Sequence, residues 1–416
     1  MSRLFFYCLF LIPTCLWAQQ DSLMIYYKAG LAAYEATDYQ GFYKAFNRAN
    51  EIRPGNPTLI YNLACGSALT GRTDHAFARL KEFLLMNAGY DFSTDKDLKN
   101  LWDDPRFLEL VEMQIDLTDT IQTSREAFTL NAQGFHPESI TYYSKDNNFF
   151  FGDIRSRRIM NADLDGSLTE WLPTQENMYA VMGIVIKESH NELWAVTAAL
   201  SEMVNYSDSL HANKSSLFVF DLATKEIKAQ WLFDDKILGG ITLGPKGNIL
   251  VSDLKQNQIW EITSLESEPS LYKDLSGNFF NIQGMTYNED CSILYLSDYI
   301  TGLYFLDKDK ELHTIRPPKN VSYKGIDGLY FHDGQLFATQ NGTKPMRFYQ
   351  FQLNRKGTAI ASAKLVDQAG ILNEPTTGTF TKDQFLFIAN SPWGAYDKSR
   401  NFNPEGPVVI LSQSLK

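Results

Sequence analysis

The sequence predicts a multidomain chain, with an N-terminal all-α helical repeat region followed by an all-β six-bladed β-propeller. Three observations lead to this fold class. Residues 20–90 have helical periodicity. After Asp116 the pattern changes to short apolar strands separated by Gly, Asn and Asp turns. Within this second part, six similar strand–turn–strand segments follow one another.

Composition narrows the classes of function. Aromatic residues are 13% and charged residues 21% of the 416 residues, which is typical of globular proteins. The formal net charge of −11 and the lack of basic clusters argue against nucleic acid and against an anionic membrane surface as partners. The sequence contains no nucleophile elbow, zinc-protease motif, phosphate loop or dinucleotide fingerprint.

The first stretch, "MSRLFFYCLFLIPTCLWAQQ", predicts a secretory signal peptide over residues 1–18, and its Gln-rich end resembles bacterial leaders. We therefore expect a periplasmic or secreted protein. Lipid attachment at Cys15 is our second choice, because Pro13 and Thr14 fit a lipidation signal poorly. After cleavage only Cys65 and Cys291 remain, in different predicted domains, so we expect neither a disulfide nor a Cys-rich metal site. No later run is long enough for a transmembrane segment.

Residues 19–115 form the predicted helical domain, with several pairs of similar residues 34 positions apart: Tyr27 and Tyr61, Gly30 and Ala64, Phe46 and Leu80. This spacing resembles the tetratricopeptide repeat. A third, divergent helix pair is expected over residues 94–113. Such arrays commonly bind a protein or peptide, and the alternative is a packing module that caps the next domain.

Residues 131–416 form the predicted propeller, and residues 116–130 a linker with a possible ring-closing strand at 126–130. Each of the six segments contains a small residue just before its first strand, at spacings of 44, 57, 44, 44 and 50: Ser139, Gly183, Gly240, Gly284, Gly328 and Gly378. About 44 residues per unit fits a four-stranded blade. The longer second spacing indicates an insertion at about 198–215. A pair of β-sandwiches would not explain this period.

In a propeller the innermost strands line the central channel, so the residue before each small residue is expected at the mouth of the channel. These six residues are Glu138, Met182, Gly239, Gln283, Asp327 and Thr377. Two carboxylates and an amide oxygen suit Ca²⁺, and Mg²⁺ or Mn²⁺ less well, so Glu138, Gln283 and Asp327 are the predicted metal ligands. The alternative is a water-filled channel with hydrogen-bonded carboxylates. His136 and Asn281 are expected at the channel rim with Met182 and Thr377.

The motifs "PESITY", "IQGMTY" and "GIDGLYF", on blades one, four and five, resemble the senescence-marker-protein/gluconolactonase (regucalcin-like) family. The resemblance covers about residues 131–416 and implies a six-bladed propeller with an axial divalent cation. The family's Glu, Asn and Asp ligands correspond to Glu138, Gln283 and Asp327. Two departures weaken the implied lactonase activity. Gln283 replaces the family's Asn, and "LGGITLG" puts Gly239 where the family has a substrate-binding Asn.

Two hypotheses follow. In the first, the protein is a metal-dependent hydrolase of lactones or esters, with Asp327 as general base. In the second, it is a non-catalytic binding propeller with a structural axial metal, which recognises a protein or glycan. Two further stretches carry polar residues beside blade strands, and turn and blade-edge hydrogen bonding is the favoured explanation for them: Gln340, Asn341, Glu374 and Thr376. Asn373, in the second stretch, is a weaker candidate for the channel rim. The sequence assigns no substrate-binding residue.

Overall fold

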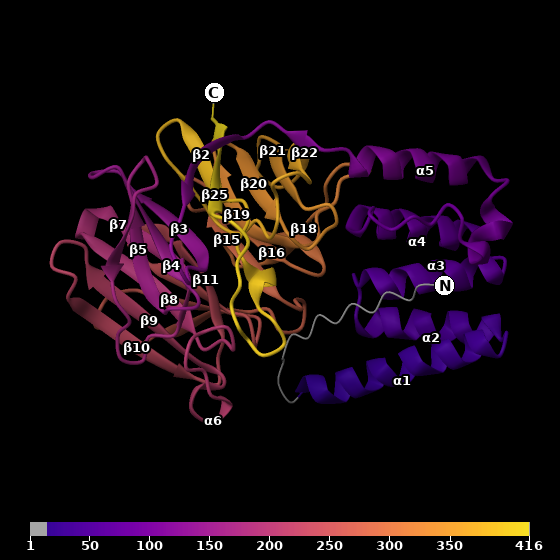
Figure 1. The fold of residues 1–416 in the computed structure, drawn as a ribbon, viewed down its shortest axis with the longest axis horizontal. Coiled ribbons are helices and arrows are strands. Elements are labelled where there is room, and N and C mark those ends of the chain that lie inside the picture. Colours follow the sequence, from indigo (N-terminus) through magenta and orange to yellow (C-terminus); the bar gives the residue numbers. More distant parts are fainter. Residues whose placement is uncertain (1–14, 416) are drawn as a thin grey trace. The chain divides into compact units, whose positions relative to one another are not determined.

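The computed structural model describes the backbone of residues 15–415 and the side chains from residue 22 (Figure 1). Residues 1–14 of the predicted signal peptide and the side chain of Cys15 lie outside the described residues. The chain divides into a helical unit, up to residue 83 with 91–111, and a propeller unit, residues 84–90 with 112–416.

The helical unit contains the predicted helices. Its elements are α1 (Cys15–Glu35), α2 (Tyr39–Ile52), α3 (Pro57–Leu69), α4 (Thr73–Met86), the 3₁₀ helix η1 (Lys96–Leu101) and α5 (Pro105–Thr118). The Asn56 side chain caps α3 by accepting from the amide of Leu59, and Pro57 starts the helix without needing a partner for its nitrogen. A Cβ on Gly30 would lie 2.5 Å from the Phe46 ring, so α1 and α2 need a small residue there. The resemblance to tetratricopeptide repeats stays a prediction.

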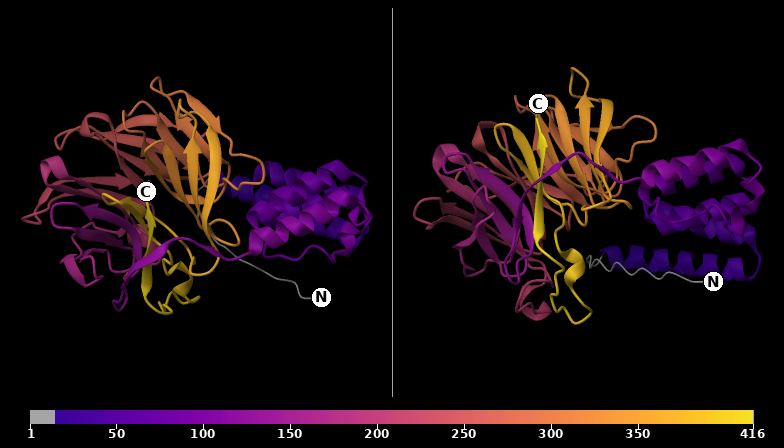
Figure 2. Two further views of the ribbon diagram at one scale, coloured as in Figure 1. Left: turned by 90° about the horizontal axis from the view of Figure 1, so that it is seen from above. Right: turned by 45° about the horizontal axis from the view of Figure 1, so that its top comes forward.

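The second unit is a six-bladed β-propeller (Figures 1 and 2). Blade 1 consists of β3 (Pro137–Tyr143), β4 (Asn148–Asp153), β5 (Arg158–Ala162) and β6 (Leu168–Leu172). Blade 2 consists of β7 (Ala180–Lys187), β8 (Glu192–Ala198), β9 (Lys214–Asp221) and β10 (Ile227–Asp234). Blade 3 consists of β11 (Leu238–Leu243), β12 (Ile249–Asp253), β13 (Gln258–Ile262) and β14 (Ser270–Asp274). The insertion expected in blade 2 is the connection between β8 and β9, with the short helix α6 (Asp208–His211).

The other three blades complete the ring. Blade 4 consists of β15 (Ile282–Tyr287), β16 (Leu294–Asp298), β17 (Gly302–Leu306) and β18 (Leu312–Ile315). Blade 5 consists of β19 (Ile326–His332), β20 (Gln335–Gln340), β21 (Arg347–Leu353) and β22 (Ile360–Gln368), and it is extended by β1 (Ile121–Gln122). Blade 6 consists of β23 (Gly378–Phe380), β24 (Gln384–Ile388), β25 (Val408–Ser414) and β2 (Arg125–Leu130). Each innermost strand contacts the next, and β23 contacts β3.

The ring is closed by pairing strands from the two ends of the propeller. The strand expected at residues 126–130 is β2, which pairs antiparallel with the C-terminal strand β25, from Arg125 opposite Ser412 to Leu130 opposite Val408. The sixth blade is therefore built from both ends of this unit, and closure leaves no innermost strand without a neighbour.

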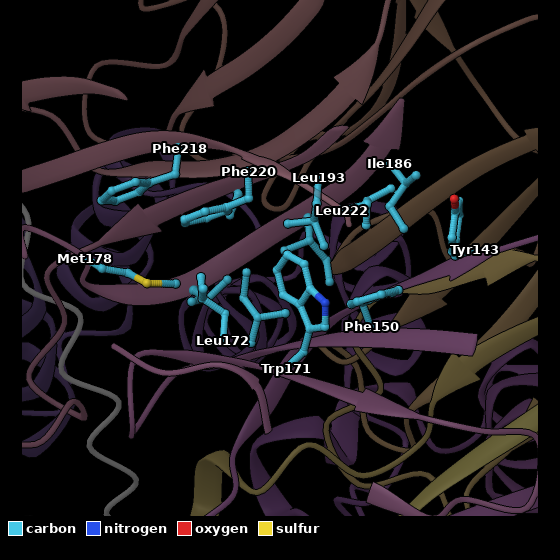
Figure 3. Close-up of a cluster of buried hydrophobic side chains, with 14 residues drawn as sticks. Tyr143, Phe150, Trp171, Leu172, Met178, Ile186, Leu193, Phe218, Phe220 and Leu222 are labelled. Carbon is cyan, nitrogen blue, oxygen red and sulfur yellow. The ribbon is translucent and has the colours of Figure 1, made fainter. Parts of the chain in front are cut away.

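Most of the core lies between blades. Figure 3 shows one such cluster, in which Phe150 and Trp171 of blade 1 meet Leu193, Phe218 and Phe220 of blade 2. Because both faces of each sheet are covered by neighbouring blades, the second strand of a blade is buried over nearly its whole length, as in β8 and β12.

Residues 84–90 join the fifth blade. The amide of Ala88 donates to the carbonyl of Lys344 at 2.7 Å, and the amide of Lys344 donates to the carbonyl of Met86 at 2.9 Å. The buried guanidinium of Arg347 donates to the carbonyl of Leu85 at 3.0 Å and to the side chain of Gln368 at 2.9 Å.

In the part of the chain that is described, no helix has the length and apolar character that crossing a membrane requires.

Candidate functional site at the propeller axis

The predicted mouth residues occupy equivalent places in the first five blades. In each of these blades the ladder between the two innermost strands changes register at the mouth residue, for example between Pro137 and Ser139 around Glu138 and between Ile326 and Leu329 around Asp327. A β-bulge turns a side chain out of its regular alternation. In blade 6, Thr377 comes just before β23. We call these six positions the axial mouth.

The small residue after each mouth position allows the inner strands to approach closely, as predicted. A Cβ on Gly328 would lie 2.6 Å from the carbonyl oxygen of Thr376 in the next blade, and one on Gly240 would lie 2.9 Å from the carbonyl oxygen of Gln283. The Gly328 amide donates to Thr339 Oγ1 at 2.9 Å. Blades 3 and 4 repeat this bond with a serine hydroxyl, so a hydroxyl on the second strand fixes the bulge.

Glu138 is the most deeply buried carboxylate of the axial mouth, with 7% exposure. Its Oε2 accepts from Trp393 Nε1 at 2.8 Å and from Ser391 Oγ at 3.3 Å, and no hydrogen bond to Oε1 is found among the described residues. Burial and then the charge of Asp327 raise the pKa of Glu138 well above its ordinary range, while the bonds from Trp393 and Ser391 lower it.

Asp327 is held by a two-step chain of hydrogen bonds. Asn341 Nδ2 donates to Asp327 Oδ2 at 2.7 Å, and Tyr299 donates its hydroxyl proton to Asn341 Oδ1 at 2.9 Å. Burial raises the pKa of Asp327 to about 6, against the lowering effect of Asn341. As at Glu138, the hydrogen bond from a described residue uses one carboxylate oxygen, here Oδ2, and leaves the other for a proton, a cation or a ligand.

Glu374, between β22 and β23, brings a third carboxylate to this group. Burial and then the charge of Asp327 raise the pKa of Glu374 to about 7, and Lys344 opposes the shift. Its backbone has φ of 61°, in the left-handed region, and its carbonyl accepts from the Ser391 amide at 3.1 Å. The sequence favoured a turn role for Glu374. The structure gives it that role and also an electrostatic connection to the axial mouth.

The fourth and sixth blades contribute neutral polar groups. Gln283 Nε2 donates to Asn281 Oδ1 at 3.3 Å, and both side chains are partly exposed. The Thr377 hydroxyl donates to the carbonyl of Glu138 at 2.9 Å and accepts from the Ile140 amide at 3.1 Å, so it holds blades 6 and 1 together.

His136 does not line the rim. It is fully buried, and its Nδ1 is 2.8 Å from the hydroxyl of Tyr396. It packs edge-on against Trp393 and is stacked with Phe402. Burial lowers the pKa of His136 to about 3, so the ring is neutral. His136 therefore supports the β24–β25 connection, which carries Trp393 to Glu138.

The predicted ligands offer oxygen atoms to a divalent cation. Glu138, Asp327 and Gln283 each have a side-chain oxygen without a hydrogen bond from another described residue, and together they form an oxygen-only set that suits Ca²⁺. By contrast, no cluster of three or more His, Cys, Asp or Glu side chains arranged to hold a metal occurs in the described part of the chain. A site here would therefore depend on Gln283 and on water as well as the carboxylates.

No family model matches the chain, and neither does any curated protein. Similar solved structures include a calcium-binding protein, regucalcin, from Agrobacterium tumefaciens (12% identity, 69% of this chain and 93% of that chain, TM-score 0.48). Others are a PQQ-bound aldose sugar dehydrogenase from Streptomyces coelicolor (14%, 71% and 99%, 0.48) and virginiamycin B lyase from Staphylococcus aureus (17%, 72% and 89%, 0.43). At these values the likeness does not bear on activity, and the propeller assignment rests on strand pairing.

Sequence reasoning missed the residues that orient the carboxylates. Trp393 and Ser391 lie in the 389–407 connection, whose length for a turn between two strands was the one available signal. Asn341 was noted as a polar residue and is the direct partner of Asp327. Tyr299 carried no signal, because its role depends on the position of Asn341.

Proposed function

We propose that the axial mouth is a divalent-cation-dependent hydrolytic site for lactones or related esters, with Asp327 as general base. The observation that supports this function best is the pair of oriented carboxylates, Glu138 and Asp327, each with one oxygen that accepts no hydrogen bond from a described residue. Two such groups of raised pKa in one small site favour either a shared proton or a bound cation.

The cation, Ca²⁺ in the first instance, would be held by Glu138, Gln283 and Asp327. When bound, it would polarise the substrate carbonyl and stabilise negative charge on its oxygen. Asp327 would take a proton from the attacking water at Oδ1, the oxygen that the hydrogen bond from Asn341 leaves available. Asn341 would keep the other oxygen of Asp327 fixed during that transfer.

The first test is Ca²⁺ titration by calorimetry, with Asp327→Asn and Glu138→Gln beside the wild type. The control is Glu405→Gln, which makes the same change at an exposed carboxylate of the 389–407 connection. We expect one ion in the wild type and the control, and loss of binding in both axial variants. A lactone and ester panel should then show Ca²⁺-dependent hydrolysis that Asp327→Asn abolishes. Absence of ion binding in the wild type would refute the proposal.

A non-catalytic binding propeller with a structural axial metal is the second candidate. Its support is Gly239, which brings no polar side chain to the third blade. Ion binding with no hydrolysis of any lactone or ester would favour this candidate. In either case we propose that the tetratricopeptide-like helices contact a protein or peptide and that the chain is exported to the periplasm. Affinity capture with the full chain, and with a full-length variant in which the exposed Leu108 and Ile115 of α5 are replaced by serine, tests the first point, and cell fractionation tests the second.

A further inference from the structure

The third blade does not leave an empty space at the axial mouth. A Cβ on Gly239 would lie 2.8 Å from three carbon atoms of Leu254, so the Leu254 side chain occupies the place where a larger mouth residue would begin. Leu254 follows β12, and its amide donates to the carbonyl of Ile237 at 2.7 Å, which fixes the turn. The side chain remains partly exposed while packing on the cluster between blades 3 and 4.

The second blade continues this apolar surface. Met182 lies in the bulge of β7, at the position equivalent to Glu138 and Asp327. It is partly exposed and packs against two clusters, one of which also contacts Trp393. A Cβ on Gly183, the residue after Met182, would lie 3.0 Å from the carbonyl oxygen of Gly239, so Met182 and Leu254 belong to adjoining positions of the axial mouth and both are apolar.

The axial mouth is therefore divided by polarity. Blades 4, 5, 6 and 1 bring Gln283, Asp327, Thr377 and Glu138, whereas blades 2 and 3 bring Met182 and Leu254. A ligand covered with hydroxyl groups would place some of them against Met182 and Leu254, where they lose water without gaining a partner. An alkyl or aryl group there would instead gain from leaving water.

We infer that the axial mouth selects an amphipathic ligand, with its carbonyl at the carboxylates of blades 1 and 5 and an alkyl or aryl group on Met182 and Leu254. The hydrolysis in this inference rests on the proposed function, whereas the choice of an amphipathic ligand does not. The substrates would be alkyl- or aryl-substituted lactones or esters, and polyhydroxylated sugar lactones would be poor substrates.

The test compares γ-butyrolactone with γ-decalactone, which adds a hexyl tail to the same ring, and with glucono-δ-lactone. Each methylene group that leaves water is worth about a fourfold gain, so burial of two gives a roughly sixteenfold higher kcat/KM for the tailed lactone. Leu254→Asn should reduce this preference to about threefold or less. Leu254→Met should keep it, because methionine has a similar volume and stays apolar.

The matched control is Leu271→Asn. Leu271 is 49% exposed on β14, the outermost strand of the same blade, so this change should leave the tail preference unaltered. Equal kcat/KM for both lactones, or a preference for glucono-δ-lactone, would overturn the inference while the proposed hydrolysis stands. An equal loss of preference in Leu271→Asn and Leu254→Asn would also overturn it.

A second measurement separates ligand chemistry from catalysis. Cyclopentanone and 2-hexylcyclopentanone keep the carbonyl and the tail but cannot be hydrolysed, and their binding is measured by calorimetry in the presence of Ca²⁺. Tighter binding of the hexyl compound that Leu254→Asn abolishes would support the inference even if no lactone is hydrolysed, in which case only the proposed function fails. No difference between the two ketones would refute the inference.

Discussion

Replacing Asp327 by asparagine should make the cation-free protein more stable at pH 8. Burial raises the pKa of Asp327 to about 6 from an ordinary value of 3.8, so its charged form is disfavoured in the folded state. A difference of this size corresponds to about 3 kcal/mol of unfolding free energy above pH 6. Asparagine has the same shape, carries no charge, and can still accept from Asn341 through its carbonyl oxygen.

The sign of the pH dependence follows from the direction of the shift. A carboxyl group with a raised folded-state pKa contributes its stability below the unfolded-state value and loses it as pH rises through the folded-state value. Wild type should therefore lose stability between about pH 4 and pH 6, while Asp327→Asn should show a smaller change. Urea denaturation of metal-free protein at pH 5 and pH 8 measures both effects. Since Asp327 is partly exposed, we expect a gain of between about 1 and 3 kcal/mol at pH 8.

The matched control is Asp298→Asn. Asp298 is fully buried at the end of β16, and its two oxygens accept from the backbone amides of Phe280, Asn281, Ile300 and Thr301. The NH₂ group of asparagine would point at backbone N–H donors, so this variant should lose at least about 2 kcal/mol of unfolding free energy. If Asp327→Asn also loses stability at pH 8, Asp327 is stabilised as an anion and the reasoning is wrong.

Three further predictions concern neighbouring features. Glu374→Gln should flatten the decline in melting temperature that wild type shows as pH rises through about 7, because the pKa of Glu374 is raised to about that value. Trp393→Phe should weaken Ca²⁺ binding, measured by calorimetry, about tenfold or more, because it removes the indole N–H that donates to the Glu138 carboxylate. Trp231→Phe is the control, since its indole N–H donates to a backbone carbonyl remote from the axial mouth, and it should leave the Ca²⁺ affinity unchanged. Gly328→Ala should lower the free energy of unfolding, measured by urea denaturation, by about 2 kcal/mol or more, because its Cβ would overlap the carbonyl oxygen of Thr376. Gly277→Ala is the control and should leave the unfolding free energy nearly unchanged, because a Cβ there would have no atom within 4 Å.

Much of the fold could be predicted from the sequence because it depends on local patterns that repeat. The near-constant spacing of residues such as Gly240, Gly284 and Gly328 reflects one physical need, the close approach of successive inner strands, and it identifies six blades. The closing strand near residue 126 was visible for a similar reason, since an unpaired apolar strand at one end matched another at the opposite end.

The sequence alone also determined where the six mouth residues lie, because each one falls at the same place in its repeat. Only the tertiary structure decided what surrounds them. Ring closure brings Trp393 to Glu138, 255 positions away, and the turn after β12 brings Leu254 over Gly239. The same closure buries His136 under the β24–β25 connection. These contacts join residues with no fixed spacing along the chain, so no periodic pattern could predict them.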